Sequence, residues 1–159
     1  MMPVAYPLDD IANADAELET ASDTERESII KSRLGQGKFR DNLLNYWSGC
    51  AVSGVTLPAF LRASHIKPWR DCTNSERLDT YNGFLLNTTL DAAFDRGFIS
   101  FADDGGILIS TALKDHAGEL SISEHMSLRS VNDLHRKYLD WHRRHVFDSA
   151  NYQVAGEAE

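Results

Sequence analysis

The chain has 159 residues, of which 42% are hydrophobic and 25% charged, and this composition predicts one ordinary globular domain with a buried core. Its two cysteines, Cys50 and Cys72, exclude a disulfide scaffold and a four-cysteine zinc site, so we expect free thiols in a reducing compartment. The net charge is −8, and the sequence shows neither a membrane-length apolar stretch nor the basic start of a signal peptide, so we expect a cytoplasmic protein with no membrane partner.

The amino-terminal part is expected to be a tail followed by two helices. Residues 1–23 are small and acidic without sustained periodicity, which predicts a flexible segment. Thr24 and Glu27 have the spacing of a capping box, so a helix should start there and end at Gly35. Past this break, the apolar stripe of Lys38–Trp47 predicts a second helix.

The middle of the chain is expected to hold two short strands and a helix. One helical turn at Pro58–Leu61 should precede a strand at Ala63–Ile66, and Arg70–Asp79 should be a loop. Asn82 and Gly83 both tolerate positive φ, which predicts a tight turn before the returning strand. The elements expected next are a strand at Phe84–Leu86, a helix at Leu90–Asp95 capped by Thr88 or Thr89, and a helix stop at Gly97.

The carboxyl-terminal part is expected to add a hairpin and a helix. Phe98–Phe101 and Ile107–Ile109 flank a polar turn with two glycines, which predicts the hairpin. An apolar stripe from Val131 to Val146 predicts the helix, and residues 148–159 should form a second flexible tail. Together the elements predict an α+β protein with a single domain at residues 24–147.

Four polar side chains stand out because they interrupt apolar surroundings: His65, Asn82, Asp91 and Asp95. The two acids are four residues apart on a predicted helix, so their carboxylates share a face and repel unless a cation lies between them. Oxygen ligands favour a hard ion such as Mg²⁺ or Mn²⁺, and an imidazole suits the removal of a proton from water. The simpler interpretations are a buried structural histidine, a turn at Asn82-Gly83, a helix-dipole acid at Asp91 and an ion pair at Asp95.

The negative charge is concentrated outside the segment that holds these residues. Residues 1–25 carry seven acidic and no basic residues, residues 26–96 carry ten basic against seven acidic, and residues 97–159 carry six against ten. The middle segment is therefore at +3, which favours a nucleic-acid partner because binding depends on local charge near the phosphates. Each basic side chain could equally be a solvated charge. The candidates for phosphate contacts are Lys38, Arg40, Lys67, Arg70, Arg77 and Arg96.

Several motifs, taken in order, resemble those of the HNH endonucleases, in the bacterial branch whose last motif reads Leu-Asp-x-x-Phe-Asp-x-Gly. The central motifs lie at residues 63–69, 76–79, 82–83 and 90–97. The resemblance extends outward through residues 35–40, 50–54, 99–101 and 138–143, so it covers roughly residues 24–147.

The resemblance implies a ββα-metal core, flanked here by the N-terminal helices, the extra hairpin and the C-terminal helix, and it implies hydrolysis of phosphodiester bonds in DNA. It makes His65 the general base, gives Asn82 the task of tying the hairpin together near the metal, and places Asp91 and Asp95 at metal-ligand positions. Ser64 departs from the family, since many members have an acid or histidine ligand there. Many also have histidine at the position of Asp91, and the aspartate shifts the preference from zinc and nickel toward Mg²⁺ or Mn²⁺. Paired Cys-x-x-Cys knuckles are missing, so no structural zinc is expected.

Two classes of function remain open from the sequence. The first is a DNA endonuclease of a restriction or other defence system, or of a mobile element. The second is an HNH-fold DNA-binding or accessory subunit with weak cleavage. A hydrolase of another kind is disfavoured, because no arrangement of a serine or cysteine nucleophile is evident. A homodimer and a partner subunit both stay open.

Overall fold

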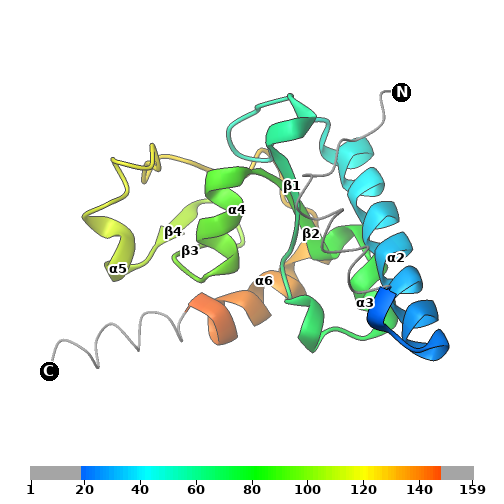
Figure 1. The fold of residues 1–159 in the computed structure, drawn as a ribbon. Coiled ribbons are helices and arrows are strands. Elements are labelled where there is room, and N and C mark those ends of the chain that lie inside the picture. Colours follow the sequence, from blue (N-terminus) through cyan, green and yellow to red (C-terminus); the bar gives the residue numbers. More distant parts are fainter. Residues whose placement is uncertain (1–18, 148–159) are drawn as a thin grey trace, which may run out of the picture.

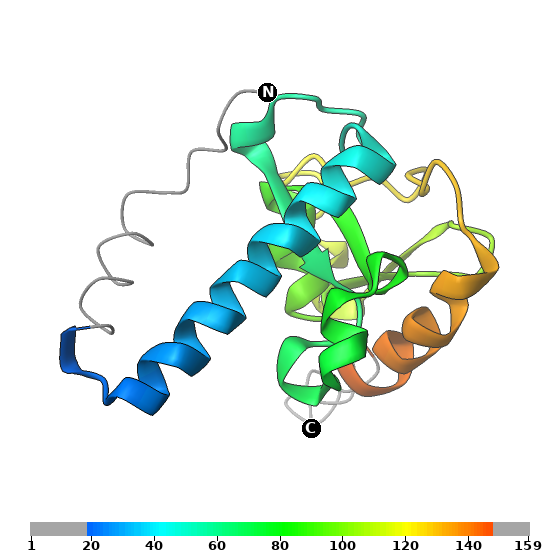
Figure 2. The same cartoon turned by 90° about the vertical axis from the view of Figure 1, so that its right-hand side faces the viewer.

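Residues 19–147 are described by the computed structural model, and Figures 1 and 2 show their fold from two sides. Helices combine with two small antiparallel sheets, so the α+β class is confirmed. The expected tail at 148–159, and residues 1–18 of the expected amino-terminal tail, lie outside the described residues. No helix within residues 19–147 is long and apolar enough to cross a membrane.

One long helix, α2 (Asp23–Trp47), replaces the two helices expected near the amino terminus, and it crosses the molecule without interruption in Figure 2. Ser22 rather than Thr24 is its N-cap, and it forms a capping box with Glu25. The expected break at Gly35 is wrong, because a glycine inside a helix costs only about 1 kcal/mol and packing holds the second half of the helix. The buried residues of that half are Phe39, Leu43 and Trp47.

The centre of the fold is a hairpin followed directly by a helix. Strand β1 (Leu61–His65), preceded by the expected single turn η1 (Pro58–Phe60), pairs antiparallel with β2 (Gly83–Asn87). Helix α4 (Thr88–Asp95) follows, and α2 and α4 lie on opposite sides of the hairpin in Figure 1. The helix is capped by Asn87, which accepts a hydrogen bond from the Leu90 N–H, rather than by a threonine. This β1–β2–α4 unit is the expected ββα core.

The connection between β1 and β2 contains more regular structure than expected. It holds the 3₁₀ turn η2 (Trp69–Asp71), helix α3 (Asn74–Leu78) and the 3₁₀ turn η3 (Thr80–Asn82). The prediction of a loop at residues 70–79 is therefore wrong, because Thr73 and Glu76 form a capping box that starts α3.

The expected tight turn at Asn82-Gly83 is also wrong. Gly83 has an extended backbone, with φ of −154°, and it begins β2. Glycine is needed there for space rather than for positive φ. A Cβ atom at Gly83 would lie 2.4 Å from Phe39 Cζ and 2.9 Å from Leu43 Cδ1. The missing side chain therefore lets α2 pack closely onto the hairpin.

The remaining elements form a second layer beside α4. Strands β3 (Ile99–Phe101) and β4 (Ile107–Ile109) form the expected hairpin, and a short helix α5 (Thr111–Lys114), which the sequence did not predict, follows. The chain then continues through η4 (Asp133–His135), α6 (Arg136–His142) and the π-helical turn η5 (Arg143–Phe147). The expected apolar stripe is correct only in part, since Tyr138 is buried whereas Leu134 is 54% exposed.

His142 connects the carboxyl-terminal helix to the ββα unit. Its Nε2 donates a hydrogen bond to the Phe94 carbonyl oxygen at 2.8 Å, and its Nδ1 accepts one from the Ser100 hydroxyl at 2.8 Å. The imidazole also stacks on the Phe94 ring. Burial lowers the pKa of His142 to about 4, so the ring is neutral at physiological pH and acts as a structural bridge.

Candidate functional site

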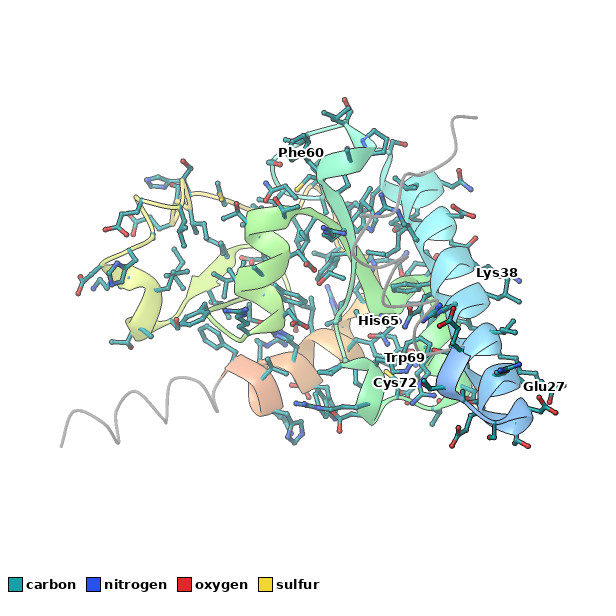
Figure 3. The ribbon with its side chains drawn as sticks, in the orientation of Figure 1. Glu27, Lys38, Phe60, His65, Trp69 and Cys72 are labelled. Carbon is teal, nitrogen blue, oxygen red and sulfur yellow. The ribbon has the colours of Figure 1, made fainter. Side chains whose placement is uncertain are left out.

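His65 ends β1 in a half-buried position between the hairpin and α2. Its Nε2 lies 2.9 Å from the Arg77 carbonyl oxygen, and because a carbonyl only accepts, Nε2 carries the proton of the neutral ring. The imidazole stacks on the Phe39 ring, with the two centroids 3.8 Å apart, and meets the edge of Trp69. Figure 3 shows His65 and Trp69 beside each other near α2. The unprotonated Nδ1 makes no hydrogen bond within residues 19–147.

The surroundings of His65 keep it neutral. Burial lowers the pKa of its imidazole below the usual 6.5, and the positive charge of Arg77 lowers it further. The bond to the Arg77 carbonyl acts in the opposite direction, because it favours a ring that donates. A neutral imidazole with one free nitrogen is the form that can accept a proton from water.

The acidic residues gather on the other side of the hairpin. Asp91 and Asp95 are one turn apart on α4, and the Ser64 hydroxyl lies beside the Asp91 carboxylate. Burial raises the pKa of Asp91, and the neighbouring Asp95 raises it further, whereas Ser64 and the positive charge of Arg62 lower it. Asp95 is exposed to solvent. Asp91 is therefore an anion that a cation would stabilise.

The strand β1 separates the histidine from the acids. Consecutive side chains of a strand point to opposite faces, so Ser64 faces α4 while His65 faces α2. In the described part of the chain β1 pairs only with β2, and the Arg40 guanidinium binds the carbonyl oxygen of Leu61 at the start of β1. Residues 19–147 contain no group of three or more His, Cys, Asp or Glu side chains that could hold a metal ion.

A protein-family model described as HNH endonuclease matches residues 50–102. The resemblance to the HNH endonucleases is confirmed. The matched HNH segment begins in the turn before η1 and ends just after β3, so it contains the whole β1–β2–α4 unit with His65, Asp91 and Asp95. HNH nucleases generally act on nucleic acid with a divalent metal ion, and the match suggests a nuclease-family function for this segment. Comparison with curated proteins finds no match.

Asn82 is fully buried within the HNH segment and spans the connection between its strands. Its Oδ1 accepts a hydrogen bond from the Lys67 N–H at 2.9 Å, and its Nδ2 donates to the Glu76 carbonyl oxygen at 3.0 Å. A third contact joins Nδ2 to the Cys72 sulfur at 3.3 Å. The side chain thus fixes the segment that presents the Arg77 carbonyl to His65.

Replacing Asn82 by alanine is expected to lower the free energy of unfolding by about 2–4 kcal/mol, because two backbone groups lose their buried partner. Chemical denaturation measures the change, and Asn45→Ala, at an exposed position of α2, is the matched control. A variant that keeps its stability but loses cleavage would show that Asn82 contacts the reacting groups directly.

The six basic candidates divide into two groups. Three have partners inside the protein: Arg40 donates to the carbonyl oxygens of Pro58 and Leu61, Lys67 binds Glu76 at 3.1 Å, and Arg77 donates to the Trp69 carbonyl and lies over its ring. These three organise the HNH segment. The exposed candidates are Lys38, Arg70 and Arg96, and the Arg70 side chain is 86% exposed although its guanidinium pairs with Asp71 at 3.5 Å.

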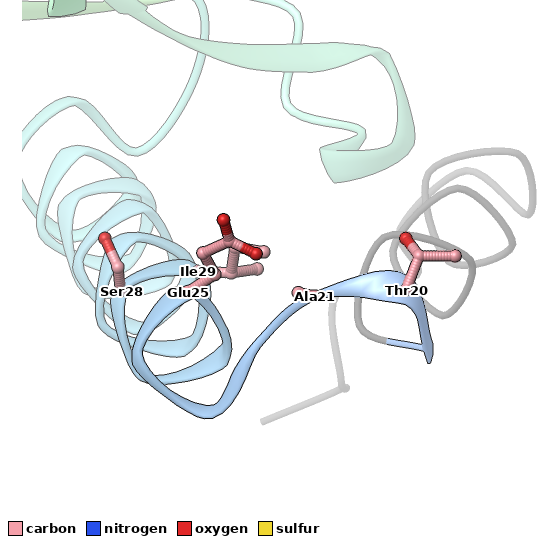
Figure 4. A pocket seen from close by; sticks show the side chains of 5 residues that line it. All are labelled: Thr20, Ala21, Glu25, Ser28 and Ile29. Carbon is pink, nitrogen blue, oxygen red and sulfur yellow. The ribbon is translucent and has the colours of Figure 1, made fainter.

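The two hollows described on the surface lie away from His65. One, of about 360 Å³, lies against the first turns of α2 and is lined by Thr20, Ala21, Glu25, Ser28 and Ile29 (Figure 4). The other, of about 540 Å³, lies between α4 and α5. The first contains no residue of the candidate site, and the second is lined in part by Arg96, one of the exposed basic candidates.

Sequence reasoning identified the principal polar residues but missed three of their neighbours. Phe39 was read only as part of an apolar helix stripe, and Ser64 only as a departure from the family. Arg62 was not considered, although strand alternation places it on the same face as Ser64. That alternation was a signal available in the sequence.

Proposed function

We propose that the chain is a metal-dependent endonuclease that hydrolyses phosphodiester bonds of duplex DNA, with His65 as the general base. The observation that carries the proposal is the state of this imidazole, whose Nε2 is tied to a carbonyl while Nδ1 has no partner in the described structure. Nδ1 would remove a proton from the attacking water, and the lowered pKa of His65 keeps it ready at neutral pH.

Asp91 and Asp95 are proposed to hold the divalent ion, and their chemistry fits Mg²⁺ or Mn²⁺. Two carboxylates on one helix face supply oxygen ligands, and Mg²⁺ is usually held by one or two carboxylates together with water and substrate phosphate. The bound ion would stabilise negative charge on the phosphate and the leaving oxygen. The neighbouring Ser64 hydroxyl favours the ionised form of Asp91, because it lowers the pKa of this carboxylate.

The direct test is cleavage of supercoiled plasmid in Mg²⁺ or Mn²⁺ compared with EDTA. We expect nicked or linear DNA only when the metal is present. We assign the activity to a restriction or other defence system, or to a mobile element. Intact plasmid with retained DNA binding would support the accessory subunit instead.

The accessory subunit has an observation in its favour. Arg62 lies close enough to Asp91 to lower its pKa, so this carboxylate already has a positive neighbour without any metal. In addition, Ser64 is a weaker ligand than an acid or a histidine. A protein that had lost efficient metal binding would keep its fold and could still bind DNA.

Reversing the charges of Arg70 and Arg96 together is expected to weaken DNA binding and to reduce the salt dependence of the affinity by about two counterions. Both side chains are exposed, Arg70 after β1 and Arg96 at the end of α4, on either side of the proposed site. Fluorescence anisotropy across a salt series measures both quantities. Lys38→Glu tests the remaining exposed candidate, which points away from β1 in Figure 3 and should have a smaller effect. An equal effect of Lys38→Glu would place the DNA across α2.

A further inference from the structure

Phe39 covers one face of the His65 imidazole. The two rings are nearly parallel, at 11°, and their centroids are 3.8 Å apart. Phe39 itself is only 1% exposed, and it reaches His65 from α2, a helix that precedes the matched HNH segment. The contact therefore joins the proposed general base to a part of the chain outside that segment.

The hairpin is shaped to admit this ring. Gly83 is the cross-strand partner of His65, so the two residues face the same side of the hairpin. A Cβ atom at Gly83 would lie 2.4 Å from Phe39 Cζ, a distance that no pair of carbons tolerates. Gly83 has an extended backbone that any residue can adopt. Glycine is therefore required at this position by the space that the Phe39 ring occupies and not by the backbone conformation.

A single hydrogen bond does not fix the direction of Nδ1. The contact between Nε2 and the Arg77 carbonyl holds one atom of the ring, and the ring can still rotate about that point. Stacking against a buried aromatic ring restrains the plane of the imidazole. The edge of Trp69, which is itself covered by the Arg77 guanidinium, closes another side. Position and plane together determine where the lone pair of Nδ1 points.

We propose that Phe39 is a positioning residue of the nuclease site, whose ring holds the His65 imidazole in the plane that directs Nδ1 toward the attacking water. The proposal rests on the proposed function of His65 as the general base. The neighbouring Arg40 supports the same alignment, because its guanidinium binds the Leu61 carbonyl at 2.7 Å and so anchors the start of β1 to α2. Adjacent residues of α2 therefore fix both ends of the strand that carries the base.

The experiment compares Phe39→Leu with Leu43→Ala, which also removes buried apolar volume from α2 next to Gly83. We expect Phe39→Leu to lower kcat roughly 10–100-fold with little change in KM, since small misplacements of a reacting group have effects of this size. Leu43→Ala should destabilise the fold to a similar degree and leave kcat close to wild type. Equal losses of kcat in the two variants would overturn the proposal.

Nitrogen-15 NMR of the His65 ring gives a readout that does not depend on cleavage. We expect the tautomer protonated at Nε2 in the wild type and in both variants, because the Arg77 carbonyl still binds Nε2, and we expect residual dipolar couplings of the ring to report a changed plane in Phe39→Leu but not in Leu43→Ala. If the wild type cleaves no DNA, the proposed function fails, but the NMR comparison still decides whether Phe39 orients the ring. An unchanged orientation of the ring in Phe39→Leu would refute the positioning role.

Gly83→Ala offers a second route to the same displacement. The new methyl group should push the Phe39 ring off His65, so kcat should fall as in Phe39→Leu. In the double variant the leucine removes the nearest of the methyl group's contacts, so the two losses should be far from additive. Additive losses would show that Gly83 and Phe39 act independently, against the proposal.

Discussion

Replacing His65 by alanine is expected to lower the rate of DNA cleavage by about 10²–10⁴, the usual contribution of a general base. The imidazole has one nitrogen bound to the Arg77 carbonyl and the other without a partner in the described structure, so its removal takes away the proton acceptor. DNA affinity should stay close to wild type, because the neutral ring carries no charge toward the phosphates. Single-turnover cleavage of a plasmid measures the rate.

His145→Ala is the control for this change, because His145 is exposed in η5 and lies outside the matched HNH segment. It should cleave DNA like the wild type. A folded His65→Ala protein with full activity would contradict the assignment of the base.

The pH dependence of DNA cleavage by the wild type should also show that a histidine is the base. The base works only when neutral, and burial lowers the pKa of His65 below 6.5. Activity at saturating metal should therefore persist below pH 6.5 and decline only when the ring becomes protonated at lower pH. A decline centred above pH 6.5 would show that another group controls the step.

The sequence predicted the ββα unit because its signals are local. Alternating strands, a helix stop at Gly97 with φ of +77°, and paired acids four residues apart all depend on near neighbours in the chain. The family resemblance then gave the residues their roles. The hairpin of β3 and β4 was predictable for the same reason.

The errors arose where contacts between distant residues decide the structure. Gly35 was expected to end a helix, but the packing of Phe39 and Leu43 against the hairpin keeps α2 continuous. Asn82-Gly83 has the composition of a tight turn, yet Gly83 is a strand residue that makes room for a ring 44 positions earlier in the chain. No residue close to Gly83 in the sequence indicates that Phe39 packs against it.

In the candidate site, too, the sequence predicted local relations but not contacts between distant residues. The spacing of Asp91 and Asp95 predicted a shared helix face, and the structure places both on α4. The sequence did not predict that Ser64 would lie beside Asp91 or that β1 would separate the acids from His65. Those relations depend on how the strand lies between two helices, which only the packing of α2 and α4 determines.

Replacing Asp91 by asparagine is expected to abolish most metal binding and to stabilise the metal-free protein slightly at neutral pH. Burial raises the folded-state pKa of Asp91 above 3.8, so ionising it costs folding free energy at every pH above that range. The amide removes this cost, while the lost interactions with Ser64 and Arg62 offset part of the gain. Melting curves in EDTA measure the effect.

Adding Mn²⁺ should distinguish the variants of the acidic residues by their stability. A metal that binds only the folded state stabilises it by about 2.7 kcal/mol at a concentration of 100 Kd. The wild type should gain this stability, and Asp91→Asn should not. Asp95→Asn should also lose the gain, and it should stabilise the metal-free protein slightly, because it removes the repulsion between Asp95 and Asp91. Asp41→Asn, an exposed acid of α2, is the control and should respond to Mn²⁺ as the wild type does.

Replacing Asp91 by histidine tests the same site by changing its preference rather than removing it. Imidazole is a softer ligand than a carboxylate, so the variant should bind Ni²⁺ or Zn²⁺ more tightly and Mg²⁺ more weakly than the wild type does. Isothermal titration with each ion compares the two. Since Asp95 remains on the same face of α4, the change of preference can come only from position 91. If all these variants bind Mn²⁺ as the wild type does, the metal is held elsewhere, and the charge on Asp91 serves its contacts with Ser64 and Arg62 instead.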